Sequence, residues 1–254
     1  MIQRMKHNRT AFLDRVRIAV QDTRDQRLPW EELIAPADDR STLARLAGRD
    51  REQQAALLLQ LIDNAAPLNL QVHTCGPLPE AADCIAALAR ASRPEFQAEK
   101  TLLFHDHPLL RALSVDALLA EDHIPCCWTC SKNPEIRHQT LAASIGVTVA
   151  DWGIAESATI VQLTRPGRPR STSLVPSIHI AVLPLSNLVA DLAEAYALIR
   201  REQDLDSLVL ISGPSKTADI EACMVFGAHG PRAMHLIVLT ESPAAVNPGF
   251  PVAI

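Results

Sequence analysis

Aromatic side chains are scarce in this sequence, where Phe, Trp and Tyr together make up 4% of 254 residues. Nucleobases and planar cofactors stack on aromatic rings, so the chain offers few platforms for them. An excess of positive charge is also missing, because the formal net charge is -5 at pH 7 and the basic residues form no stripe. We therefore expect no nucleic-acid partner.

Long hydrophobic runs are absent as well. No stretch approaches the roughly 18 apolar residues of a membrane span, and charged residues follow Met1 where a signal peptide requires an apolar segment. The six cysteines are too sparse for a secreted disulfide scaffold. We expect a cytoplasmic protein with reduced thiols and no membrane span.

Hydrophobic residues nevertheless make up 48% of the chain, which is ample for a packed core. Thr10–Thr23 has the spacing of an amphipathic helix that docks on a partner or on the main body. Residues 28–51 show no sustained period, and Glu52–Ile62 predicts a second helix with Leu57, Leu58, Leu61 and Ile62 inward. We therefore divide the chain into an N-terminal helical arm, residues 1–66, and a main domain, residues 67–254.

Short apolar runs alternate with helical patterns from Leu68 onward. The expected strands are Leu70–Val72, Thr101–Phe104, Val147–Val149, Thr159–Leu163, His179–Leu183, Leu208–Ile211 and His235–Leu239. The expected helices are Pro79–Ala91, Pro134–Ser144 and Leu188–Arg200, the second capped by Asn133 and ended by Gly146. Two of these strands, His179–Leu183 and His235–Leu239, are almost continuously apolar, as are strands of sheets that are buried on both faces. We therefore predict a three-layer α/β/α sandwich with a mainly parallel sheet.

Two candidate functional residues lie beside the predicted strands, whose carboxyl ends are where open α/β sheets bind ligands. Glu156 stands between two β-rich runs in small and apolar company. It is a candidate buried acid, nucleophile or ligand anchor, or else a carboxylate that bonds loop amides. His179 is either a ligand-binding residue or a satisfied core histidine.

Two further segments carry polar groups near strand ends. The segment Ile211–Glu221 lacks the spacing of a P-loop, yet its backbone from Gly213 to Thr217 could hold one anion or form a capped turn. In Phe226–Arg232, His229 lies between two glycines and precedes Arg232. These residues could bind a carboxylate or form a tight turn.

The cysteines offer half of a metal site. Cys127 and Cys130 form one C-x-x-C with His123 and His138 nearby, which leaves the ligand set incomplete. Cys75, Cys84 and Cys223 have no other cysteine near them in the sequence, and a free cysteine of this kind usually behaves as a small buried hydrophobic residue.

Over about Leu68–Thr240, the chain resembles the LUD domain of LutC-type lactate-utilization proteins. The resemblance rests on three segments in this order: Ala155-Glu156-Ser157-Ala158-Thr159, Ser212–Glu221 and Gly227–Pro231. The resemblance implies a fold like the CoA-transferase and ribose-5-phosphate-isomerase group. It also implies a non-redox subunit of an L-lactate dehydrogenase complex, which acts beside two iron-sulfur proteins in oxidizing L-lactate to pyruvate. The clusters are expected in those partners, with no cofactor in this chain. Ala158 replaces a glycine usual in the family, and the cysteines around Cys126 are not a family feature.

The leading hypothesis is an accessory subunit with a strand-end pocket for a small carboxylate such as lactate, or for docking of the iron-sulfur partners. The candidate catalytic residues are Glu156 and His229. The candidate ligand-binding residues are Ser157, His179, Gly213, Ser215, Lys216, Thr217, Asp219, Glu221, Gly230 and Arg232. The alternatives are an independent acyl- or CoA-transferase-like enzyme with Glu156 as nucleophile, and a metal-binding module at Cys127 and Cys130. Assembly into a homo-oligomer stays open.

Overall fold

The computed structural model describes residues 13–16, 18, 39–93, 100–130, 133–202, 205–220 and 223–241. The chain divides into two units, residues 1–38 and residues 39–254. In the first unit, residues 13–16 and 18 are helical and lie within the predicted helix Thr10–Thr23, whose other residues are outside the described part.

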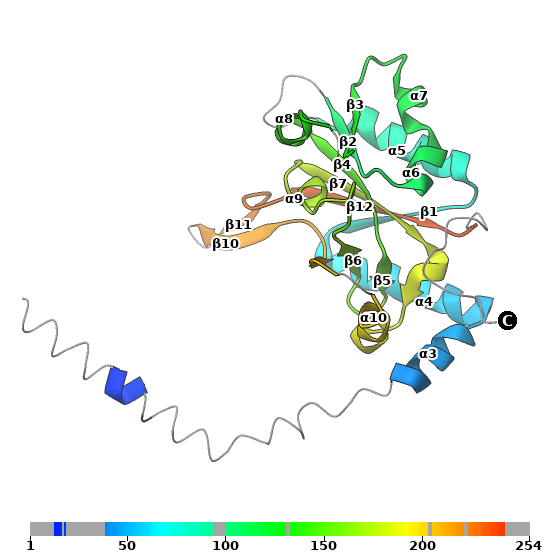
Figure 1. Cartoon of the computed structure of the whole chain (residues 1–254), viewed down its shortest axis with the longest axis vertical. Coiled ribbons are helices and arrows are strands. Elements are labelled where there is room, and N and C mark those ends of the chain that lie inside the picture. The colour runs from blue at the N-terminus through cyan, green and yellow to red at the C-terminus, as the bar shows by residue number, and fades with distance from the viewer. Residues whose placement is uncertain are drawn as a thin grey trace, which may run out of the picture. The chain divides into compact units, whose positions relative to one another are not determined.

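A six-stranded, wholly parallel sheet forms the centre of this unit (Figure 1). Its strands, in spatial order, are β1 (Leu70–Cys75), β12 (Ala233–Leu239), β7 (Ile178–Pro184), β4 (Ile145–Val149), β2 (Leu102–Phe104) and β3 (Cys126–Trp128). Every residue of β7 and four consecutive residues of β12 are buried, which confirms the prediction from their continuous apolar runs. All seven predicted strands are present, although two of them belong to a second sheet.

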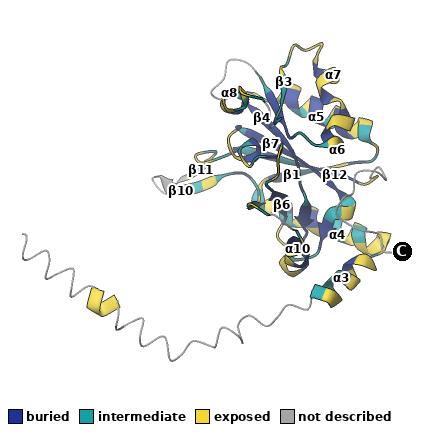
Figure 2. Ribbon diagram, in the orientation of Figure 1, coloured by how far each residue is buried: buried dark blue, intermediate teal, exposed yellow. Residues whose placement is uncertain are grey.

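The two faces of the main sheet are covered differently. The helices α5 (Leu78–Ala91), α6 (Pro108–Leu113) and α7 (Val115–Leu119) pack on one face in a single apolar cluster. The other face receives α4 (Arg51–Ala65) and a mixed sheet of β8 (Leu188–Val189), β5 (Trp152–Ile154), β6 (Thr159–Leu163) and β9 (Leu208–Ile211). The α/β class and the parallel sheet are therefore confirmed, whereas the second covering layer is partly a sheet. Figure 2 shows burial concentrated on the central strands.

The remaining elements are short. They are α3 (Asp39–Ala47), α8 (Ile136–Ala142), α9 (Ser171–Leu174), α10 (Leu192–Ile199), the 3-10 turns η1 (Ala66–Leu68) and η2 (Leu185–Asn187), and the hairpin of β10 (Lys216–Ile220) and β11 (Cys223–Phe226). The predicted helix Leu188–Arg200 was wrong at its start, because Leu188 and Val189 pair with β5 before Asp191 caps α10. Residues 28–51 were treated as irregular, yet residues 39–47 form α3. The predicted helix Glu52–Ile62 is confirmed as α4, but Ile62 is exposed.

Gly146 was predicted to end a helix, and this was wrong. The helix α8 ends at Ala142, and Gly146 lies inside the buried strand β4. A Cβ atom at this position would lie 1.8 Å from the carbonyl oxygen of Thr172 on α9. Glycine is needed here because the backbone of α9 passes directly over the strand.

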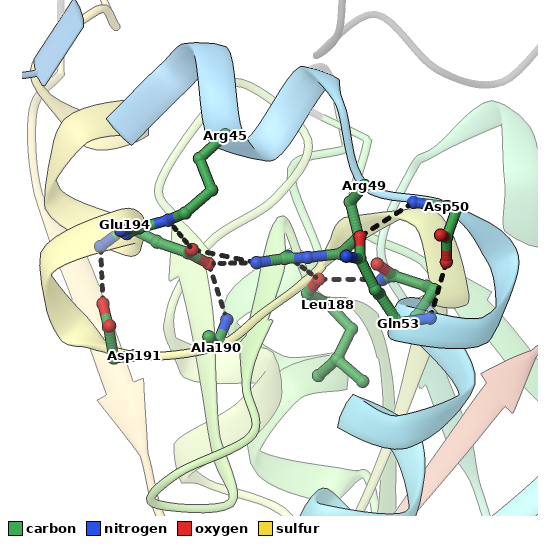
Figure 3. Close-up of polar contacts among 9 residues, drawn as sticks. Arg45, Arg49, Asp50, Gln53, Leu188, Ala190, Asp191 and Glu194 are labelled. Atoms are coloured by element: carbon green, nitrogen blue, oxygen red, sulfur yellow. Dashed lines mark hydrogen bonds and ion pairs between the residues drawn. The ribbon is translucent and has the colours of Figure 1, made fainter. Parts of the chain in front are cut away.

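The helices α3 and α4 are bound to the body by a buried carboxylate on α10 (Figure 3). Glu194 is 1% exposed and accepts hydrogen bonds from Arg49 Nη2 at 2.8 and 2.9 Å, from Arg45 Nε at 3.3 Å and from the Ala190 backbone N–H at 2.7 Å. At the other end of α4, Asn64 Nδ2 donates to the carbonyls of Ala155 and Glu156. The predicted domain boundary after residue 66 stays a prediction.

Candidate functional site

The loop that carries Glu156 joins β5 to β6. The Glu156 side chain is exposed, so the expectation of a buried acid was wrong. Its backbone N–H donates to the Ala190 carbonyl at 3.0 Å, and its own carbonyl accepts from Asn64 at 2.9 Å. The loop is therefore fixed through its backbone, and the carboxylate is left to solvent.

A chain of hydroxyl groups links this loop to the segment after β9. Ser157 Oγ lies 2.8 Å from Thr159 Oγ1, which lies 2.6 Å from Ser212 Oγ. Ala158 adopts φ +45°, which is uncommon for a residue other than glycine, and its side chain is fully buried. Gly213, which follows Ser212, has φ +89°, and a Cβ there would lie 2.9 Å from the Leu68 carbonyl oxygen. These contacts bring the Glu156 loop and the segment Ile211–Glu221 together.

The segments Ile211–Glu221 and Phe226–Arg232 also meet. The Ser215 backbone N–H donates to the Pro231 carbonyl at 2.8 Å, and the Gly227 N–H donates to the Ser215 carbonyl at 3.0 Å. A Cβ on Gly230 would lie 3.4 Å from Ser215 Cβ. The His229 side chain between the two glycines is exposed.

The other candidates of these segments take different positions. Lys216 is exposed, with its ammonium 5.8 Å from the ring centre of Phe226. Arg232 Nη2 donates to the Arg93 carbonyl at 2.6 Å, and Thr217 is partly buried. Glu221 and the side chain of Asp219 lie outside the described residues.

These segments gather at the amino edge of the main sheet, opposite to the edge we predicted. Gly213 lies against Leu68, just before β1, and the Arg232 N–H donates to Ser177, just before β7. The prediction failed because Gly227–Arg232 precedes β12, and because the strand ending at Ile211 belongs to the second sheet. We call the loops around Glu156, Ser212–Ser215 and Gly227–Gly230, which carry the exposed side chains of Glu156, Ser212 and His229, the motif surface.

His179 lies apart from the motif surface, on the buried strand β7. Its Nε2 atom is 2.8 Å from Thr148 Oγ1, and burial lowers the pKa of this imidazole to about 3. It is a neutral core histidine. The structure adds polar residues that the sequence analysis did not single out, namely His105, Gln162 and Arg168, all buried near the carboxyl ends of β2 and β4. The run His105-Asp106-His107 directly after a predicted strand was the available signal.

The cysteine-rich segment does not gather a ligand set in the described residues. Cys127 lies on β3, the outermost strand of the main sheet, and both Cys127 and Cys130 are partly buried free thiols. No group of three or more His, Cys, Asp or Glu side chains in the described part of the chain could hold a metal ion. Each helix of that part is also too short or too polar to cross a lipid bilayer.

The fold and the motif surface define an α/β protein with a wholly parallel main sheet and a set of exposed loops along its amino edge. The chain matches the LUD domain over residues 58–239, more than half of its length, and therefore belongs to the LUD domain family. This confirms the resemblance drawn from Ser212–Glu221 and Gly227–Pro231.

Among its relatives are proteins named Lactate utilization protein C. The one from Exiguobacterium sp. is 43% identical over 118 residues, covering 44% of this chain and 51% of its own. The one from Halalkalibacterium halodurans is 33% identical over 150 residues, covering 57% and 64%. The chain thus spans about half to two thirds of the length of these relatives. A solved structure of a DUF162 family protein from Deinococcus radiodurans aligns with 73% of this chain and 98% of its own chain, at a TM-score of 0.48 and 19% sequence identity. This likeness is too distant to bear on function.

Proposed function

We propose that this chain is a subunit of an L-lactate oxidation system, and that its motif surface docks an iron-sulfur partner protein. The names of its relatives supply the pathway, lactate utilization. Oxidation of L-lactate to pyruvate removes two electrons, which the partner's iron-sulfur clusters would accept, while this chain would hold no redox centre. The likeness to the CoA-transferase and ribose-5-phosphate-isomerase group is part of the same proposal.

Exposed apolar side chains beside the motif surface carry the docking proposal. Met224 and Phe226 on β11 are 59% and 43% exposed, and Leu174 and Val175 at the end of α9 are 41% and 45% exposed. A Cβ on Gly230 of the motif surface would lie 3.8 Å from the Leu174 carbonyl oxygen, so the end of α9 adjoins the motif surface. Figure 1 shows the β10–β11 hairpin projecting from the body at this edge. Apolar groups rimmed by polar ones are typical of a protein-binding surface.

The docking proposal also accounts for the geometry of the candidate residues. Glu156, Lys216 and His229 all reach solvent, as side chains that contact a partner protein do in the free chain. Charged groups at the rim of an interface govern the association rate and the choice of partner. We therefore assign Glu156 and His229 to partner recognition.

Anaerobic co-purification of the tagged full chain from its native host tests this function. We expect two iron-sulfur proteins to accompany the chain, with lactate-dependent dye reduction. The double variant Met224→Ser, Phe226→Ser should fold normally and lose the partners. The matched control is Tyr196→Ser on α10, which is 40% exposed and lies away from the hairpin. A colourless, solitary chain, or partners retained by the double variant, would contradict the docking proposal.

One observation favours a second function, acyl transfer with Glu156 as nucleophile. The exposed carboxylate is accessible to a thioester, which it could attack to form an acyl-enzyme anhydride with release of the thiol. Incubation with acyl-CoA followed by mass spectrometry tests this. An added acyl mass that the Glu156→Gln variant does not acquire would favour the transferase, and its absence would count against it.

A further inference from the structure

The strand order places a topological switch point between β2 and β4, which are neighbours in the main sheet (Figure 1). From β2 the chain continues through α6 and α7 to β3, at the edge of the sheet. From β4 it continues through β5, β6 and α9 to β7, on the opposite side. In open α/β sheets, ligands bind at the carboxyl ends of strands whose connections diverge in this way. This is the edge opposite to the motif surface.

A segment between β6 and α9 covers the carboxyl ends of these two strands. The Asp106 N–H, just after β2, donates to the Gly167 carbonyl at 2.9 Å. Arg168 Nη2 donates to Asp151, just after β4, at 2.6 Å. His105 Nε2 lies 3.2 Å from the Pro169 carbonyl oxygen. Residues 165–170 therefore close over the ends of β2 and β4.

Buried polar side chains lie beneath this segment and along the adjoining α9. We call them the switch cluster: His105, Thr148, Gln162, Arg168, Thr172 and His179, each at most 8% exposed. His105 Nε2 lies 3.0 Å from Gln162 Nε2, and Thr148 Oγ1 lies 2.8 Å from His179 Nε2. Phe104 is in register with Val147, so His105 and Thr148 are side by side on one face, where Thr172 passes over Gly146.

The switch cluster presents polar atoms that the protein does not satisfy. His105 Nδ1, Gln162 Oε1, Arg168 Nε, Thr172 Oγ1 and His179 Nδ1 are buried and have no hydrogen-bond partner among the described residues. Buried polar groups in folded proteins are almost always paired, so a concentration of unpaired ones at one site calls for a ligand or ordered water.

The chemistry of these atoms suits a carboxylate. Arg168 Nε can only donate a hydrogen bond, and the Thr172 hydroxyl can donate one. Burial, followed by the nearby Arg168 guanidinium, lowers the pKa of His105 to about 3, so the imidazole is neutral at pH 7. Asp151 already neutralises Arg168. A bound carboxylate would leave one uncompensated negative charge unless a proton entered with it, and a neutral imidazole can accept that proton.

We propose that the switch cluster binds one small carboxylate, whose oxygens accept hydrogen bonds from Arg168 Nε and Thr172 Oγ1 while His105 takes up one proton. The choice of a small carboxylate rests on the proposed function. The charged and titratable groups that face His105 are Arg168, His107 and His179, and the one that faces His179 is His235. Asp151 acts on His107 and pairs with Arg168. Because His105 becomes protonated in the complex, affinity should rise by up to about tenfold for each pH unit lowered.

Calorimetric titration of the purified full chain with sodium L-lactate, pyruvate and acetate tests this site, with sodium chloride as the ionic control. We expect binding that tightens from pH 7.5 to pH 6.5. Thr172→Val keeps the shape and removes the unpaired hydroxyl, so the affinity should fall about tenfold with no loss of stability. The control is Ser173→Ala, the neighbouring residue, whose hydroxyl is already bonded to the Arg170 carbonyl at 3.0 Å.

The outcomes separate this site from the proposed function. No binding of any of the three carboxylates, or binding that Thr172→Val leaves unchanged, would overturn the switch-cluster site even if the iron-sulfur partners co-purify. Carboxylate binding by a chain that recovers no partners would support the site and overturn the subunit proposal. Binding without a pH dependence would exclude proton uptake by His105.

Discussion

At the scale of single residues, Glu194 has the largest consequence for stability. Its carboxylate is buried, and Arg49, the main partner, is itself 12% exposed. Glu194→Gln keeps the shape but leaves the Arg49 guanidinium buried without a counter-charge, so it should lower the free energy of unfolding by about 3 kcal/mol. Urea denaturation monitored by circular dichroism measures this loss.

The control for that prediction is Glu202→Gln. Glu202 also accepts from an arginine, Arg165, but the two side chains are 25% and 40% exposed. Such a pair contributes about 0.2 to 1 kcal/mol because water screens it. Equal losses in the two variants would show that burial of Glu194 does not set the strength of its ion pair.

Individual site residues were predicted less well than their neighbourhoods. The residues around Glu156 and Ser212 do come together, yet Glu156 is exposed because its loop is held by backbone bonds to Ala190 and Asn64. Burial of one side chain depends on such long-range contacts, which the local sequence does not encode. For the same reason no local pattern indicates that Gln162, on β6, meets His105, just after β2.

At the scale of elements, β7 and β12 were predictable because each carries a continuous apolar run that a parallel, doubly covered sheet requires. The helix α3 was missed because only Leu46 of its nine residues is buried, so almost no apolar period marks it. The predicted helix Leu188–Arg200 included the strand β8, because an apolar pair as short as Leu188 and Val189 fits a strand and a helix equally well.

Gly146 controls the packing of α9 on β4. In Gly146→Ala the new methyl group would meet the Thr172 carbonyl oxygen, a backbone atom that cannot move without shifting α9. We expect a loss of about 3 kcal/mol or more in unfolding free energy, or failure to accumulate as soluble protein. Thermal denaturation and the soluble yield measure the two outcomes.

Gly48→Ala is the matched control for that substitution. A Cβ at Gly48 would meet no atom closer than 3.5 Å, so this variant should change the stability by less than about 1 kcal/mol. A fully stable Gly146→Ala protein would mean that α9 can lift from the strand at little cost.

At the scale of the whole molecule, several buried histidines make stability depend on pH. Burial lowers the pKa of His105 and His179 to about 3, and that of His107 and His235 to about 4. In the unfolded chain these groups titrate near their ordinary value of about 6.5. Between the two values only the unfolded chain binds the proton, so each group lowers stability by up to about 1.4 kcal/mol per pH unit as the pH falls below about 6.5.

We therefore expect a flat stability above pH 7 and a steep loss between pH 6.5 and pH 4. Urea midpoints at pH 7.5, 6.0 and 5.0 measure this dependence of stability on pH. His179→Gln should lower the number of protons taken up on unfolding by about one. The same substitution at the exposed His123 should leave that number unchanged. An equal urea midpoint at all three pH values would rule out neutral buried imidazoles.

The extent of the folded unit is the last property that belongs to the whole molecule. The predicted boundary after residue 66 assigns α3 and α4 to an arm, but their side chains are shared with the main cores. Leu61 and Ala65 pack in one cluster with Leu70 and Leu236, and Leu46 packs with residues of β5 and α10. Removal of these helices would expose both clusters and leave Glu194 without Arg49.

Truncation tests which unit folds. A chain starting at Asp39 should match the full chain in unfolding free energy within about 1 kcal/mol, because it keeps every contact described for α3 and α4. A chain starting at Pro67 should lose its near-ultraviolet circular dichroism and aggregate, because apolar side chains of both cores would meet water. If instead the shorter chain folds cooperatively and keeps the fixed packing of Trp152, then α3 and α4 are an arm, and the boundary predicted from the sequence is the real one.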